Sequence, residues 1–143
     1  MRRRRLLLLL LVALAAYGIW FWRGAQGPGP SLDSQELLTL LADTANQINA
    51  RVPTMVDAET RLRGAEAGPG ARLTYRYELV TFQRDDMDQR RFVALKKPEL
   101  VAAACQRAEV RYLLTQGATL VYLYDDKMGE RIADIGLARG DCP

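Results

Sequence analysis

Two cysteines, Cys105 and Cys142, are the residues of this chain with the clearest covalent chemistry. An even pair in an oxidising compartment is typical of a disulfide. The bridge would close a loop of about 37 residues and, by the chain-entropy model, stabilise the fold by about 3–4 kcal/mol. The alternatives are a redox pair, which the absence of a Cys-x-x-Cys motif disfavours, and two free thiols. We therefore expect Cys105 and Cys142 to form a structural disulfide.

Catalytic side chains are scarce in the rest of the sequence. There is no histidine, which excludes the commonest general base, the usual catalytic triads and most zinc sites. Ser31 and Ser34 fall in an expected linker and at an expected helix start, where neither has a partner base. We expect no enzymatic activity, no cofactor and no metal.

Acidic side chains cluster twice. A helix start attracts acids for capping and dipole reasons alone, which accounts for Asp85, Asp86 and Asp88 without catalysis. The second cluster faintly resembles a calcium loop, but its oxygen ligands have the wrong spacing and Lys127 interrupts it. Its members are Asp125, Asp126 and Glu130. We expect a hairpin turn there.

Three further patterns have ordinary explanations. Gly68-Pro69-Gly70 is not a phosphate loop, because no Gly-Lys-Ser/Thr follows it and a strand comes next. Arg139-Gly140-Asp141 is an RGD triplet that we interpret as coincidence beside the disulfide. Four tyrosines could form an aromatic platform for a ligand or for single-stranded nucleic acid, although cross-strand core packing explains them as well. They are Tyr75, Tyr77, Tyr122 and Tyr124.

The N-terminal stretch predicts the cellular compartment in which the rest of the chain lies. Residues 6–22 form an apolar run without a charge, which as a helix would measure roughly 25 Å against a hydrocarbon core of about 30 Å. Aromatic side chains near its end, Trp20 and Trp22, suit a membrane interface. Basic residues flank it: Arg2, Arg3, Arg4 and Arg5 before it and Arg23 after it. This asymmetry predicts an inner-membrane anchor with a cytoplasmic N-terminus and a periplasmic domain.

Other interpretations of the stretch remain open. A cleaved signal peptide fits the charged start, the leucine run and Ala13-Leu14-Ala15, but the apolar run continues well beyond the small residues. A lipoprotein would need a cysteine where Tyr17 stands. A buried soluble helix is the last alternative. The anchor and the cleaved signal both place the domain outside the cytoplasm.

The charge of the exported part argues against nucleic acid as a partner. Of the 20 Lys and Arg residues, five flank the apolar run. The exported part therefore contains the other 15 together with all 17 Asp and Glu residues. The domain therefore carries a net charge of about −2, whereas phosphate contacts need a basic face. The basic cluster is better explained by anionic lipid beside the membrane.

The remaining pattern predicts three parts and one fold class. Residues 1–23 are the anchor, residues 24–32 a Gly/Pro linker, and residues 33–143 an α+β domain. Asp33 and Glu36 predict a capping box, Pro98 a helix start, and Gly117 a helix end. Alternating and apolar runs predict four strands. We expect the order α-β-β-α-β-β, with a four-stranded antiparallel sheet packed by helices on one face.

The predicted domain resembles a group of small exported or membrane-anchored bacterial envelope proteins of unknown function. The resemblance rests on residues 48–57, 73–77, Cys105, 113–117 and 122–129. It implies an α+β domain with a disulfide in the envelope and carries no catalytic residues. A looser architectural likeness connects the domain to secretion-system pilotins, which chaperone an outer-membrane ring.

These observations favour a non-enzymatic periplasmic domain that binds another envelope protein. The alternatives are a domain that binds a small ligand or a peptide, and a membrane-bound immunity protein against a periplasmic toxin. The oligomeric state stays open.

Overall fold

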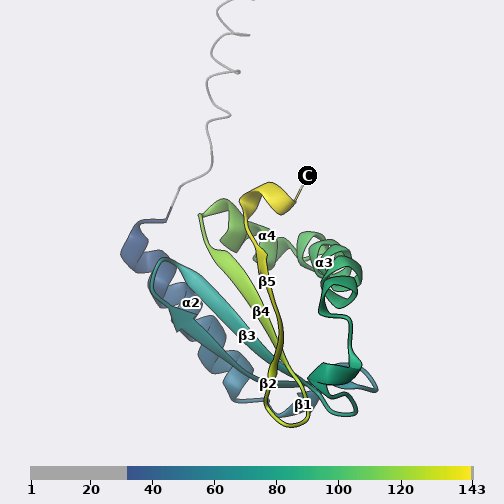
Figure 1. The fold of residues 1–143 in the computed structure, drawn as a ribbon. Coiled ribbons are helices and arrows are strands. Elements are labelled where there is room, and N and C mark those ends of the chain that lie inside the picture. Colours follow the sequence, from purple (N-terminus) through teal and green to yellow (C-terminus); the bar gives the residue numbers. More distant parts are fainter. Residues whose placement is uncertain (1–31, 143) are drawn as a thin grey trace, which may run out of the picture. The chain divides into compact units, whose positions relative to one another are not determined.

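The computed structural model describes residues 32–142 (Figure 1). The expected anchor and its residues Arg2, Arg3, Arg4, Arg5, Trp20, Trp22 and Arg23 lie outside that range. The elements follow in the order α2 (Ser34–Asn49), β1 (Thr54–Met55), β2 (Thr60–Gly68), β3 (Arg72–Leu79), η1 (Arg84–Asp86), α3 (Gln89–Gln106), α4 (Ala108–Thr115), β4 (Thr119–Asp125), β5 (Arg131–Leu137) and η2 (Arg139–Asp141).

Helix α2 begins as its sequence predicts. The Asp33 carboxylate accepts the Glu36 N–H at 2.8 Å, and the Glu36 carboxylate accepts the Asp33 N–H at 3.2 Å. This reciprocal pair satisfies two of the N–H groups that a helix start leaves free. Leu37, Leu41 and Ala45 are buried along one side, so α2 packs its apolar stripe on the sheet.

The sheet corrects the expected fold class. It has five strands in the order β1-β2-β3-β4-β5, and it is mixed, because β3 and β4 run parallel while the other neighbours are antiparallel. The expected four-stranded antiparallel sheet is therefore wrong. The two-residue strand β1, which pairs with Arg61 and Leu62, is the strand that the sequence pattern did not indicate.

The parallel pair follows from the crossover between β3 and β4. The chain leaves β3, runs through η1, α3 and α4, and re-enters the sheet at the end where β3 began. A two-residue turn can only return a strand antiparallel, whereas a helical crossover allows a parallel neighbour. The segment of two helices is long enough for this crossover, so β4 lies beside β3 in the same direction.

Helix α3 also differs from its expected bounds. Pro98 was expected at a helix start, but it lies inside α3, which runs unbroken from Gln89 to Gln106. Proline removes one backbone N–H donor from a helix. The apolar residues on both sides of Pro98 pack against the core, among them Phe92 and Leu100, and this burial holds the two halves in one helix. The chain then breaks at Arg107, and α4 follows.

The core lies between one face of the sheet and the helices. Helix α2 packs along β2 and β3, and α3 packs against β5 (Figure 1). The largest side chains with almost no exposure are Leu41, Leu73, Leu114, Leu120, Ile135 and Leu137. Burying each leucine or isoleucine contributes about 1.5–3 kcal/mol, so this cluster is the main stabilising element of the fold.

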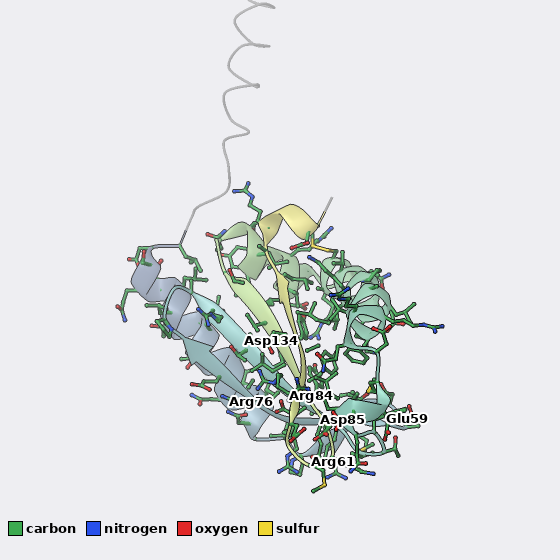
Figure 2. The ribbon with its side chains drawn as sticks, viewed as in Figure 1. Glu59, Arg61, Arg76, Arg84, Asp85 and Asp134 are labelled. Atoms are coloured by element: carbon green, nitrogen blue, oxygen red, sulfur yellow. A yellow bond between two sulfur atoms is a disulfide. The ribbon has the colours of Figure 1, made fainter. Side chains whose placement is uncertain are left out.

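The opposite face of the sheet is lined with charged side chains (Figure 2). Glu78 pairs with Arg63 at 3.1 Å, and Arg76 pairs with Glu66 at 2.9 Å. Arg131 reaches both Asp125 and Asp134. Because these pairs are partly solvated, each contributes about 0–1 kcal/mol. The face is therefore a polar surface in contact with water.

None of the helices within residues 32–142 combines the length and the apolar character that a bilayer crossing needs. The transmembrane helix of the expected fold class falls on residues 1–23, outside that range.

Asn49 covers the outer edge of β2. Its side-chain amide donates to the Ala65 carbonyl at 2.8 Å, and its carbonyl oxygen accepts the Ala65 N–H at 2.8 Å. The amide therefore replaces a neighbouring strand at this position of an otherwise open edge. Gly64 permits the approach, because a Cβ there would stand 3.3 Å from the Asn49 oxygen.

We expect Asn49→Ala to lower the free energy of unfolding by about 1–2 kcal/mol, because it leaves both Ala65 groups without their partner. Urea denaturation followed by circular dichroism measures the change. Asn46→Ala on the exposed side of α2 is the matched control and should change stability by less than about 0.5 kcal/mol. Equal effects of the two variants would contradict a specific role for Asn49.

Candidate functional site

Four tyrosines form a continuous row on the covered face of the sheet. Parallel pairing places Tyr75 opposite Tyr122 and Tyr77 opposite Tyr124. The rings of each pair stack with centroids 5.1 Å apart and planes within 16° of parallel. The register of β3 and β4 therefore brings the Tyr-x-Tyr spacing of both strands together in one stack.

The rings of this row belong to the core. Tyr122 is 8% exposed and Tyr124 is 2% exposed, while Tyr75 and Tyr77 are half-buried and pack on them. The rings stack on their cross-strand neighbours, so they stabilise the pairing of β3 and β4. The cross-strand packing interpretation is confirmed.

The hydroxyl groups of the row form no hydrogen bond with one another or with other residues in the range 32–142. Within residues 32–142, no buried side-chain oxygen or nitrogen lacks a hydrogen-bond partner. The hydroxyls of the four tyrosines make none of the hydrogen bonds within this part of the chain, and the half-buried Tyr75 and Tyr77 are the more exposed of the four. We call these four oxygens, of Tyr75, Tyr77, Tyr122 and Tyr124, the hydroxyl strip.

The electrostatics of the hydroxyl strip keep it neutral. Burial raises the pKa of all four phenols, and the neighbouring phenols raise the pKa of Tyr77 and Tyr122 further. The positive charge of Arg107 acts in the opposite direction on the pKa of three of them without reversing it. The strip therefore offers protonated hydroxyls as donors, with the positive charge of Arg107 acting on three of them, which suits carbonyl or carboxylate acceptors. The sequence pattern did not point to Arg107.

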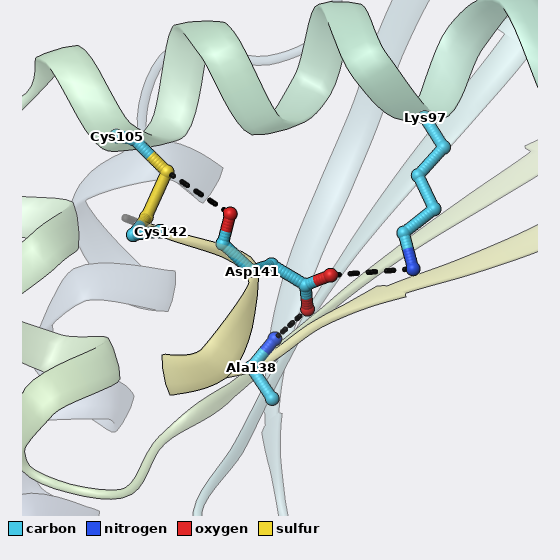
Figure 3. Close-up of a disulfide and its surroundings, with 5 residues drawn as sticks. All are labelled: Lys97, Cys105, Ala138, Asp141 and Cys142. Carbon is cyan, nitrogen blue, oxygen red and sulfur yellow. Dashed lines mark hydrogen bonds and ion pairs between the residues drawn. A yellow bond between two sulfur atoms is a disulfide. The ribbon is translucent and has the colours of Figure 1, made fainter.

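The disulfide is formed as expected. Cys105 of α3 is bonded to Cys142, with a Cα–Cα distance of 5.5 Å (Figure 3). Asp141, the last residue of the RGD triplet, accepts the Ala138 N–H at 2.8 Å and pairs with the Lys97 ammonium at 3.3 Å. The N–H of Ala138 and then the Lys97 contact lower the pKa of Asp141, against the effect of its partial burial. The RGD triplet thus lies in η2, and the carboxylate of its Asp141 already contacts Ala138 and Lys97 of the same chain.

The two acidic clusters have structural roles. Asp85 and Asp86 lie in η1, and Asp88 caps α3 by accepting the Arg91 N–H at 3.1 Å. Asp126 is only 2% exposed and accepts three backbone N–H groups of the β4–β5 turn and η1. The hairpin interpretation of this second cluster is therefore confirmed. Residues 32–142 contain no group of three or more side chains that could hold a metal ion.

A shallow apolar groove of about 700 Å³ runs along α3. Val93, Pro98 and Val101 are among its walls, and Lys97 and Gln106 are its only polar side chains in this part of the chain. So few polar groups leave little basis for recognising a specific small molecule. The hydroxyl strip, which gathers several hydrogen-bond donors, is the better candidate for recognition.

No family model matches the chain. No curated protein matches it either. Among solved structures, it is similar to a protein of Pseudomonas aeruginosa described as secreted, with 22% identity, a TM-score of 0.68, and coverage of 80% of this chain and 100% of that one.

Two pilotins of type 2 secretion systems share the fold. EpsS of Vibrio vulnificus has 15% identity and a TM-score of 0.63, and AspS of Vibrio cholerae has 17% identity and a TM-score of 0.59. Each match covers 76% of this chain and 94% of the pilotin. The expected likeness to exported proteins and pilotins is confirmed at the level of the fold.

Proposed function

We propose that this protein is an exported, non-enzymatic accessory protein of the bacterial cell envelope, and that it binds another envelope protein through the hydroxyl strip. The observation that carries the proposal is the set of four phenol oxygens, two of them on half-buried tyrosines, that form no hydrogen bond within residues 32–142. Tyrosine suits interfaces because its ring is fixed in the protein while its hydroxyl bonds to the partner.

Two observations support the location. A disulfide between Cys105 and Cys142 is stable in the periplasm and rare in the cytoplasm. The proteins that share the fold are a protein described as secreted and two secretion-system pilotins. The partner is therefore an envelope protein, and the chemistry of the strip selects a segment that presents backbone carbonyls or carboxylates.

We expect the variant Tyr75→Phe/Tyr77→Phe/Tyr122→Phe to capture its partner at least about tenfold less well than the wild type. Each substitution removes one hydroxyl and keeps the ring in the core, and each lost hydrogen bond costs about 0.5–1.5 kcal/mol. Crosslinking in intact cells followed by quantitative mass spectrometry of the envelope fraction measures the capture.

Tyr112→Phe is the matched control, because Tyr112 is 43% exposed on α4 and outside the strip. It should capture the same partner as the wild type. The proposal fails if no partner is recovered reproducibly, or if the triple variant and the control capture it equally well. An unchanged circular dichroism spectrum of the triple variant would show that the loss concerns the surface and not the fold.

A further inference from the structure

A hollow of about 430 Å³ lies between the β1–β2 loop and the start of α3. Its inner wall is apolar and consists mainly of Leu79, Phe82, Met87 and Phe92. The ring of Phe92 meets Tyr124 edge-on at 5.1 Å, which fixes this wall to the core. The volume lies within the range of small-molecule sites, about 300–1,000 Å³.

The rim of this Phe82 hollow is acidic. Asp57 and Glu59 line it, and both side chains are exposed at the mouth. The Asp57 carboxylate accepts the Glu59 N–H at 2.9 Å and the Thr60 N–H at 2.7 Å. This local turn holds the carboxylate in place before any ligand arrives, so little conformational entropy is lost on binding.

The charges around the Phe82 hollow leave it negative. Slight burial raises the pKa of Asp57, but hydrogen bonds from Glu59 and Thr60 and the charge of Lys96 outweigh it, and the net pKa is lowered. Asp57 is therefore ionised at neutral pH. Lys96, the one basic residue among the lining residues, acts on Asp57 and also donates to the Glu99 carboxylate at 3.0 Å, so one ammonium stands against the carboxylates of Asp57, Glu59 and Glu99. Two carboxylates, of Asp57 and Glu59, thus line the same hollow as two phenylalanine rings.

We propose that the Phe82 hollow binds a primary ammonium group carried on an apolar body. The carboxylates of Asp57 and Glu59 hold the cation, and the aromatic and aliphatic wall buries the apolar part. Phe82 and Phe92 add an attraction between the cation and their ring faces. This inference does not depend on the proposed function, because the hollow and the hydroxyl strip use different residues.

The test is calorimetric titration of the purified full-length protein with 2-phenylethylamine. We expect saturable binding with a dissociation constant on the order of 1 mM or below. The neutral isostere 2-phenylethanol should bind at least about tenfold more weakly, because it cannot form charge-assisted hydrogen bonds. The anion 3-phenylpropanoate should not bind measurably.

Variants place the binding in the hollow. Asp57→Asn keeps the oxygen that accepts the two backbone N–H groups and removes the charge, so it should weaken amine binding about tenfold or more. Glu59→Gln should weaken amine binding as well. If Asp57→Asn does not fold, Glu59→Gln alone tests the role of the carboxylates. Glu109→Gln, an exposed acid on α4, is the control and should bind like the wild type.

Several results would overturn the proposal. These are the absence of saturable amine binding, equal binding of amine and alcohol, tighter binding of the anion, or full binding by both charge variants. None of them bears on partner capture through the hydroxyl strip, which is measured separately with the tyrosine variants. The failure of one proposal is therefore distinguishable from the failure of the other.

Discussion

Replacing Cys105 and Cys142 together by serine is expected to lower the free energy of unfolding by about 3–4 kcal/mol. The bridge spans 37 residues of sequence and ties the end of the chain to α3. Within that loop lie α4, β4 and β5, so its loss frees a large part of the unfolded chain. The consequence should be visible as a lower urea midpoint, measured by circular dichroism.

Two controls separate the disulfide from its surroundings. The wild-type protein under reducing conditions should show the same loss as the double serine variant. Lys97→Ala removes only the partly exposed contact with Asp141 and should cost less than about 1 kcal/mol. A double serine variant as stable as the oxidised wild type would mean that packing alone holds the end of the chain.

The second large effect is expected from Asp126→Ala, which should lower the thermal midpoint by about 10 °C. One carboxylate oxygen of Asp126 accepts the Arg84 N–H at 2.9 Å, and the other accepts the N–H groups of Met128 and Glu130 at 2.8 Å each. The side chain thus connects η1 with the β4–β5 turn. Alanine leaves all three donors without their acceptor.

Asp125→Ala is the matched control for this effect. Asp125 is the preceding residue, and its carboxylate pairs with the side chain of Arg131 near the surface. Its removal should shift the thermal midpoint by only a few degrees. If the two alanine variants unfold at the same temperature, the network around Asp126 does not stabilise the fold as its geometry indicates.

The same carboxylate gives an expected pH dependence. Burial raises the pKa of Asp126, but the N–H groups of Arg84, Glu130, Met128 and Gly129 outweigh it, and the net pKa is lowered. A carboxylate with a lowered folded-state pKa stabilises the fold above its unfolded-state pKa of about 3.9 and loses this contribution as the pH falls through the folded value. We expect Asp126→Asn to lack this part of the acid destabilisation. Urea denaturation of both proteins between neutral pH and about pH 3 measures it, and identical acid slopes would contradict it.

Several local features could be read from the sequence because neighbours along the chain decide them. The Asp33–Glu36 capping box needs only residues three positions apart. Gly117 follows α4 with a φ of 95°, a backbone conformation that glycine adopts without strain. The disulfide was predicted from the number of cysteines and the compartment, although neither gives its position on α3.

Other features depended on contacts that the local pattern does not contain. Strand β2 continues to Gly68 through a stretch of glycine and alanine that has no strand pattern of its own. Ala65 and Ala67 pair there with Tyr75 and Leu73 of β3, and Asn49 holds the other side of Ala65 from α2. These pairings outweigh the weak strand preference of glycine and alanine.

The sequence by itself determined the start of α2, the hairpin around Gly129 and the residue types available for chemistry. These depend on composition and on interactions within a few positions. Only the tertiary structure decided the parallel pairing of β3 and β4, the continuation of α3 through Pro98, and the two candidate sites. The hydroxyl strip joins residues about 47 positions apart, and the Phe82 hollow joins residues from Asp57 to Lys96. Such contacts form only when the whole chain packs, because burial in the common core repays the entropy of closing the long loops between them.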